Sequence, residues 1–258
     1  MHKSVVIDCF PDSVRAYRHG YAIVAVDVIR ATTSAITVAA NGGRCFPVAS
    51  IDDARRLVTE LKDPLLAGEL GGEMAPGFEI NNSPAELSLR ASIGRPVILL
   101  SSSGTKLIHE ARACDIVYLA CFRNYDYAAY HLADRYARVA VIGAGSRGEF
   151  RQEDQMCCAW ITKELIGAGY IPENNKTVDL VDRWADEGPE AALDGKSADY
   201  LRRSGQTRDL EFIVTHINDL DAAFAMKDGE LIAVPAEEPQ PAASLSSITN
   251  TAPEARTT

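Results

Sequence analysis

Short apolar runs alternate with helical patterns over the first two thirds of the chain. Strands are expected at residues 4–7, 22–28, 44–48, 64–67, 97–100, 116–120 and 139–142, and helices at 33–40, 51–61, 105–111, 124–136 and 152–166. This alternation is typical of an α/β protein. We therefore predict a three-layer α/β/α sandwich around a mixed, largely parallel sheet.

The last third has a weaker pattern. Helices are expected at 189–203 and 208–218, and a hairpin at 222–234 that turns at Asp228 and Gly229 and closes the sheet. Residues 235–258 are rich in Pro, Ala, Ser and Thr, which favours a disordered tail. We expect one domain over 1–234, with a division into two subdomains near 115–140 as the alternative.

The composition excludes several classes of partner. The formal net charge of −10 argues against nucleic acid, which demands clustered Lys and Arg. No stretch approaches the roughly 20 apolar residues of a membrane helix, and the first residues lack the apolar core of a signal peptide. The six cysteines are scattered without a CxxC pair, which favours reduced thiols. We expect a cytoplasmic protein with a small anionic ligand, and the sequence leaves a homodimer open.

Residues 22–40, AIVAVDVIRATTSAITVAA, are the main candidate for a functional site. An apolar strand ends at Asp27, Arg30 follows, and Thr32, Thr33 and Ser34 open a helix. Ligands of α/β sheets bind outside the carboxyl ends of strands, and a helix N-terminus favours an anion. The same residues also fit an ordinary helix cap, so both interpretations stand on this stretch alone.

Three other loops that follow predicted strands carry similar chemistry, namely 69–83, 101–105 and 143–154. In a parallel sheet such loops converge on one edge. Their acids, together with Asp27, are oxygen ligands of the kind that magnesium prefers. The candidate metal ligands are Asp27, Glu69, Glu73, Glu153 and Asp154, and the candidate phosphate ligands are Arg30, Thr32, Thr33, Ser102, Ser103 and Thr105.

Other motifs are less specific. Residues 143–148, GAGSRG, match the dinucleotide pattern GxGxxG, but they follow a late strand and no acid-terminated strand comes after their helix. Dinucleotide binding would require measurable affinity for NAD. Cys9 and Arg15 have the spacing of cysteine phosphatases, but Pro11 removes a backbone donor from that loop. No GxSxG motif is present, so a serine hydrolase is not supported.

Four motifs in order resemble the magnesium-dependent 2-phosphosulfolactate phosphatases over about residues 5–234. They are VDVIRATTS (26–34), LAGELGGEMAPGFEINNSPAEL (66–87), SSSGT (101–105) and GAGSRGEFRQED (143–154). The resemblance implies an α/β/α sandwich and hydrolysis of a phosphate ester on a sulfonated three-carbon hydroxy acid. With it we assign catalysis to Asp27, Arg30 and Glu69, Mg²⁺ to Asp27, Glu69 and Asp154, and substrate or phosphate to Thr32, Thr33, Ser102, Ser103, Gly104, Thr105 and Arg147.

The sequence departs from the family pattern at three places. Leu70 replaces the basic residue of GERGG, Ser103 replaces the amide of TTNGT, and Arg151 and Gln152 replace a common Ser-Leu. Arg147 or Arg151 is a candidate to supply the lost positive charge. Two functions therefore remain: a phosphatase, or a non-catalytic member that binds a related phospho- or phosphonocarboxylate. For the phosphatase, the nucleophile is either water activated by the metal or Asp27 itself.

Overall fold

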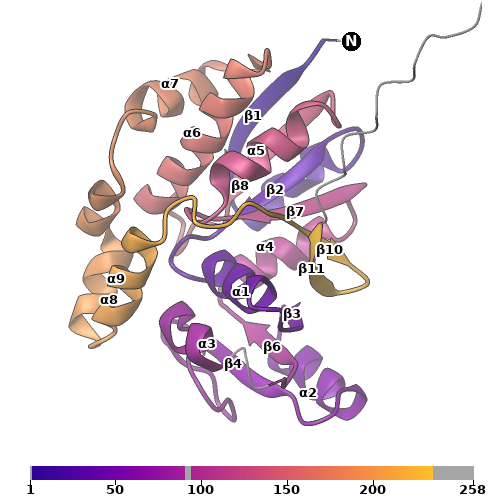
Figure 1. Ribbon diagram of the computed structural model, residues 1–258, viewed down its shortest axis with the longest axis vertical. Coiled ribbons are helices and arrows are strands. Elements are labelled where there is room, and N and C mark those ends of the chain that lie inside the picture. The colour runs from indigo at the N-terminus through magenta and orange to yellow at the C-terminus, as the bar shows by residue number, and fades with distance from the viewer. Residues whose placement is uncertain (1, 91–93, 235–258) are drawn as a thin grey trace, which may run out of the picture.

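A computed structural model describes residues 2–90 and 94–234 (Figure 1). The predicted tail at 235–258 lies outside the described residues. The strands are β1 (Ser4–Cys9), β2 (Ala22–Val26), β3 (Cys45–Val48), β4 (Leu65–Leu70), β5 (Glu73–Met74), β6 (Val97–Leu100), β7 (Ile116–Ala120), β8 (Arg138–Gly143), β9 (Ile171–Pro172), β10 (Ala223–Lys227) and β11 (Glu230–Val234). The helices are α1 (Ala31–Ala40), α2 (Ile51–Glu60), α3 (Pro84–Arg90), α4 (Gly104–Ala111), α5 (Tyr125–Ala133), α6 (Gln152–Gly167), α7 (Asn175–Trp184), α8 (Lys196–Arg203) and α9 (Thr207–Thr215), with 3-10 turns η1 (Pro11–Tyr17) and η3 (Pro189–Asp194).

The strands form an 11-stranded mixed sheet in the order β5-β4-β6-β3-β11-β10-β7-β2-β8-β1-β9. The predicted hairpin is confirmed, with its turn at Asp228 and Gly229, but it lies in the middle of the sheet between β3 and β7. Three successive antiparallel pairings therefore separate β3 from β7. As a result, the parallel group β4-β6-β3 runs opposite to the parallel group β7-β2-β8-β1.

Helices cover both faces of the sheet, which confirms the predicted sandwich. Alternate side chains of a strand point to opposite faces, and β2 shows this clearly. Val24 packs in a hydrophobic cluster with residues of α5 and α6, whereas Ile23 packs in a second cluster with residues of α1 and α4. All five residues of β2 are buried, as expected for a central strand of a doubly covered sheet.

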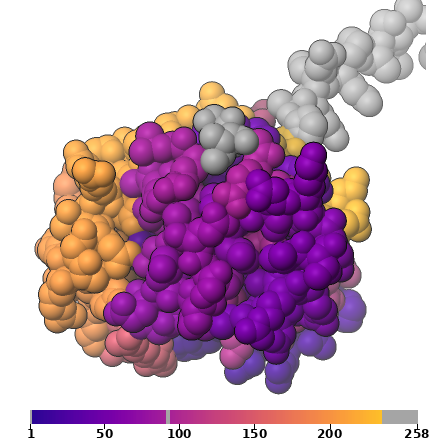
Figure 2. All heavy atoms as spheres, turned by 90° about the horizontal axis from the view of Figure 1, so that it is seen from below, coloured from indigo at the N-terminus to yellow at the C-terminus, as the bar shows by residue number. Residues whose placement is uncertain are grey.

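The C-terminal helices α8 and α9 lie beside the first half of the chain, where α9 contacts α3 (Figure 2). Leu201 of α8 and Leu210 of α9 form a small apolar cluster on which Ile29 packs. The loop after β2 is thus held by a segment more than 160 residues later in the sequence.

Several elements differ from the sequence prediction. The predicted helix at 189–203 is divided at Gly195 into η3 and α8. Helices α3 and α7 were not predicted, although each begins with a capping side chain: the Ser83 hydroxyl accepts the Glu86 N–H, and the Asn174 carbonyl accepts the Thr177 N–H. No helix among the described residues has the length and apolarity needed to cross a membrane.

The central hairpin should be essential for stability. Phe224 on β10 is 1% exposed and pairs with Leu119 of β7. Phe224→Ala is expected to lower the free energy of unfolding by about 3–5 kcal/mol, because it leaves a cavity where the two strand groups join. Leu89→Ala, at a position 77% exposed, is the control and should change it by less than about 0.5 kcal/mol. Equal losses in urea titrations of both variants would contradict this role of the hairpin.

Candidate active site

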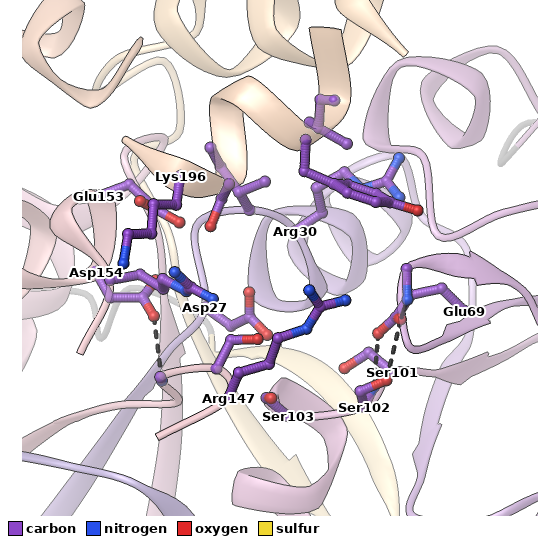
Figure 3. Close-up of a pocket in the computed structure, with 18 of the residues that line it drawn as sticks. Asp27, Arg30, Glu69, Ser101, Ser102, Ser103, Arg147, Glu153, Asp154 and Lys196 are labelled. Atoms are coloured by element: carbon purple, nitrogen blue, oxygen red, sulfur yellow. Dashed lines mark hydrogen bonds between the residues drawn. The ribbon is translucent and has the colours of Figure 1, made fainter. Parts of the chain in front are cut away.

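One cavity of about 740 Å³ lies where the four loops highlighted by the sequence meet. Its lining includes Asp27, Arg30, Glu69, Ser101, Ser102, Ser103, Gly145, Ser146, Arg147, Glu153 and Asp154 (Figure 3). The predicted convergence of these loops is confirmed. They come from both parallel groups, although the groups run in opposite directions. The twist that accumulates along a sheet, about 20–25° per neighbouring pair of strands, turns one group relative to the other.

Asp27 follows β2 directly and is only 7% exposed. Its backbone N–H donates to the Thr32 hydroxyl at 2.9 Å, and that hydroxyl donates to the Asp27 carbonyl oxygen at 2.8 Å. The carboxylate packs against Gly104, the first residue of α4. A Cβ atom at Gly104 would lie 2.1 Å from Asp27 Oδ2 and 2.5 Å from the Cβ of Ala31, the first residue of α1. The N-termini of α1 and α4 therefore meet at this carboxylate, and their dipoles favour its negative charge.

Burial and neighbouring acids disfavour the ionisation of Asp27 and Asp154. Burial raises the pKa of Asp27 to about 7, and the negative charges of Glu69 and Glu153 add to the rise. The Ala31 N–H and the Arg30 guanidinium act in the opposite direction. Burial, followed by the charges of Asp27 and Glu153, raises the pKa of Asp154 well above its ordinary value. The site is therefore short of positive charge at its centre.

Glu69 joins the end of β4 to the loop after β6. Its Oε1 accepts the Ser102 N–H at 2.6 Å, and its Oε2 accepts the Gly72 N–H at 2.7 Å and the Ser102 hydroxyl at 3.0 Å. The Gly71 N–H also donates to that hydroxyl at 2.7 Å. Both oxygens of Glu69 are thus used to hold two loops together.

The first turn of α6 contributes two buried acids of different character. Asp154 Oδ1 accepts the Val28 N–H at 2.9 Å, and Oδ2 accepts the Gly145 N–H at 3.4 Å. Glu153 is 1% exposed, and its Oε2 has no hydrogen-bond partner within the described residues. Burial raises the pKa of Glu153, while a hydrogen bond from Ser197 lowers it. Glu153 Oε2 is therefore a buried acceptor that no described residue satisfies.

Arg30 reaches the cavity, but its guanidinium is mainly held by the protein. It forms a buried ion pair with Asp209 of α9 and donates to Gln206 at 2.7 Å and Asn81 at 3.0 Å. Asp209 in turn accepts the Ser83 hydroxyl at 2.5 Å. The pair anchors the C-terminal helices to the loop after β2.

Three predicted phosphate ligands have other roles in the structure. Each hydroxyl donates to a carbonyl oxygen earlier in its own turn. Thr32 and Thr33 donate to the carbonyl oxygens five residues earlier, both at 2.8 Å, and Thr105 donates to the one four residues earlier, at 2.9 Å. None of the three lines the cavity. The side chains are short, and the turn that opens a helix brings its own carbonyl oxygens closest to them. These threonines shape the two turns, whereas Ser102 and Ser103 do line the cavity.

The predicted metal ligands do not form a ready-made cluster among the described residues. Within residues 2–90 and 94–234, no three Asp, Glu, His or Cys side chains are grouped so as to hold a metal ion by themselves. The carboxylate oxygens of Glu69 and Asp154 accept hydrogen bonds from backbone N–H groups, so both side chains are directed toward loops. Glu73 lies outside the cavity lining, and its carboxylate accepts the Tyr200 hydroxyl at 3.3 Å.

Helix α8 supplies a wall of the cavity that the sequence did not predict. Lys196, Ser197, Asp199, Tyr200 and Arg203 line it. The Tyr200 ring covers Gly72, where a Cβ atom would lie 2.5 Å from its Oη. Because α8 does not follow a strand, the rule that places ligands at strand ends could not identify it.

The chain matches known proteins along most of its length. A family model described as 2-phosphosulpholactate phosphatase matches residues 9–228. A "Probable 2-phosphosulfolactate phosphatase" of Clostridium perfringens (strain SM101 / Type A) is 30% identical over 226 residues, covering 82% of this chain and 88% of that protein. Proteins with the same name are 32% identical in Symbiobacterium thermophilum (74% and 81% covered) and 30% identical in Deinococcus radiodurans (88% and 90% covered).

The contact between Gly104 and Asp27 predicts a sharp steric effect. Gly104→Ala should lower the free energy of unfolding by about 1–3 kcal/mol, because the added methyl group overlaps a buried carboxylate and the Cβ of Ala31. Gly167→Ala, at the end of α6, is the matched control, since nothing lies within 4 Å of its Cβ position. It should leave stability unchanged or raise it by up to about 1 kcal/mol. Urea titrations compare the two, and a neutral Gly104→Ala variant would contradict the packing.

The raised pKa of Asp27 predicts a pH-dependent effect of Asp27→Asn. The folded protein binds the Asp27 proton more tightly than the unfolded chain, because the pKa is about 7 rather than the ordinary 3.8. Ionised Asp27 therefore costs stability, and the cost grows as the pH rises from about 4 to 7.

In EDTA, Asp27→Asn should thus be more stable than the natural protein by about 1–3 kcal/mol at pH 8, and by less at pH 5. Asp134→Asn, at an exposed position, should show no such trend. A gain that is the same at both pH values would be inconsistent with a buried, repelled Asp27.

Proposed function

The chain belongs to the 2-phosphosulfolactate phosphatase family, and we propose that it is a magnesium-dependent phosphatase acting on a small anionic phosphate monoester. The observation that carries the proposal is the buried Asp27 carboxylate, surrounded by further acids at the meeting point of two helix N-termini. Water replaces the ester oxygen on phosphorus, giving the free hydroxy acid and inorganic phosphate. Such chemistry depends mainly on positioning and charge neutralisation.

The acids favour a divalent cation at the centre of the cavity. Magnesium is commonly held by one or two carboxylates together with water and substrate phosphate, so a preformed group of three acids is not required. Asp27 would be the first ligand, and Glu153 would be the second because its Oε2 lacks a partner among the described residues. Glu69 and Asp154, assigned to the metal from the sequence, would instead position the loops. When bound, the ion would offset the charge of the phosphoryl group and polarise its bonds.

The chain's own groups would hold the phosphoryl oxygens and orient the ester. The N-termini of α1 and α4 meet beside Asp27, and the positive ends of their dipoles make a setting suited to an anion. Ser102 and Ser103 line the same side of the cavity. Arg30, fixed by Asp209, would contribute positive charge without having to be ordered by the substrate.

Two nucleophiles are compatible with this site. Asp27 could attack phosphorus and form an acyl phosphate that water then hydrolyses, or water could attack directly with Asp27 as a metal ligand. Acid quenching during turnover of a ³²P-labelled ester distinguishes them, because only the first route leaves label on the protein at Asp27.

The proposal predicts magnesium-dependent release of phosphate from 2-phosphosulfolactate, 2-phospholactate or phosphoglycolate. EDTA should abolish the release and added Mg²⁺ should restore it. Asp27→Asn should lower kcat/KM by about 10³-fold or more, because it removes the central carboxylate. Asp186→Asn, an acid exposed on the surface, should retain full activity. Binding of these esters without phosphate release would instead support the non-catalytic alternative.

A further inference from the structure

The loop between β8 and α6 holds an arginine in an unusual backbone conformation. Ser146 and Glu149 exchange two backbone hydrogen bonds at 2.9 and 3.0 Å, which closes a tight turn. Its two central residues, Arg147 and Gly148, both have positive φ values, 51° and 77°. This is the pattern of a type I′ turn, in which Asn, Asp or Gly is preferred at the first central position. An arginine there is strained, and such strain clusters at functional sites.

The side chain of Arg147 extends from this turn across the cavity. Its Nη2 donates to the carbonyl oxygen of Gly71 in the β4–β5 turn at 3.2 Å. Figure 3 shows its guanidinium between Asp27 on one side and Glu69 on the other. Arg147 therefore reaches the turn in which Leu70, 39% exposed, supplies no charge.

Most of the other cations that line the cavity are already paired with acids. Arg30 is bound to Asp209. Arg151 and Lys196 both bind Glu149, at 2.8 and 2.6 Å. These ion pairs partly neutralise the three positive charges before any ligand binds.

Arg147 is different because, among the described residues, its only hydrogen-bond partner is a neutral carbonyl group. Within the described residues it has no carboxylate within 4.0 Å, and its hydrogen bond to a carbonyl oxygen leaves the other guanidinium donors available. A guanidinium offers paired donors that match a carboxylate or sulfonate well. Arg203 also lines the cavity without an ion pair among these residues, but it lies at the end of α8 and has no strained turn holding it.

We propose that Arg147 is the specificity-determining residue of this site and binds a second anionic group of the substrate, a carboxylate or sulfonate. The inference rests on the proposed phosphatase function. The phosphate lies at Asp27 and the helix N-termini, and the second anion lies under the guanidinium of Arg147. The enzyme therefore selects phosphate esters of hydroxy acids over esters of uncharged alcohols.

Two esters that differ only in the second anion test this assignment. The natural protein should hydrolyse 2-phospholactate with a kcat/KM at least 100-fold above that for isopropyl phosphate. Arg147→Asn should lower kcat/KM for 2-phospholactate by about 10- to 100-fold, mainly through KM, because it removes a charge-assisted contact. The value for isopropyl phosphate should change less than about 3-fold.

A stability measurement and two further variants separate this role from a structural one. Asn suits the left-handed turn, so Arg147→Asn should keep or raise the melting temperature while it loses selectivity. Arg147→Lys should restore part of the preference for 2-phospholactate. Arg55→Asn removes the same charge at an exposed position outside the cavity and should leave the preference unchanged.

The outcomes distinguish the two proposals. If the natural protein releases phosphate from both esters and Arg147→Asn keeps the same preference, the assignment of Arg147 is wrong and the phosphatase function stands. If the natural protein releases phosphate from no ester with Mg²⁺, the phosphatase function fails and this inference fails with it.

Discussion

The burial of the Asp27 carboxylate between the first residues of α1 and α4 is the constraint on which the site depends. Glycine at position 104 allows the two helices to approach so closely that any side chain would overlap the carboxylate. Helix α1 follows β2 and helix α4 follows β6, and these strands belong to the two oppositely directed groups of the sheet. The contact at Asp27 therefore joins loops from both strand groups around one cavity. The central hairpin makes that geometry available by joining the groups.

The site combines a centre rich in acids with a wall rich in bases. Burial raises the pKa of Asp27, Glu153 and Asp154, and the negative charge of Glu153 adds to the rise for both aspartates. That arrangement is unfavourable for the protein alone, and the cation of the proposed function would offset it. Arg147 is also in an unfavourable setting, since its backbone is held in a conformation that asparagine or glycine prefers. Strain and repulsion thus occur at the residues to which we assign ligands.

The sequence was sufficient to predict the sandwich and the loops that meet at the cavity. Apolar runs such as the one before Asp27 identify buried strands, and ligands follow their carboxyl ends. The sequence could not show whether a hydroxyl turns toward a ligand or back toward its own chain, which is why Thr32, Thr33 and Thr105 were assigned to phosphate. It also could not place α8 at the cavity, because that contact joins Tyr200 to Gly72 across the fold. The central position of the hairpin depends on pairings with β3 and β7 that no local pattern encodes.

In the proposed function, the cavity at Asp27 binds a divalent cation together with a phosphate group. The most direct test is anomalous diffraction from crystals soaked with Mn²⁺ and inorganic phosphate, since manganese also prefers oxygen ligands. We expect a manganese peak within direct coordination distance of the Asp27 carboxylate, with phosphate bound to the same ion beside the N-termini of α1 and α4. Manganese found only at surface acids, with none at Asp27, would contradict it.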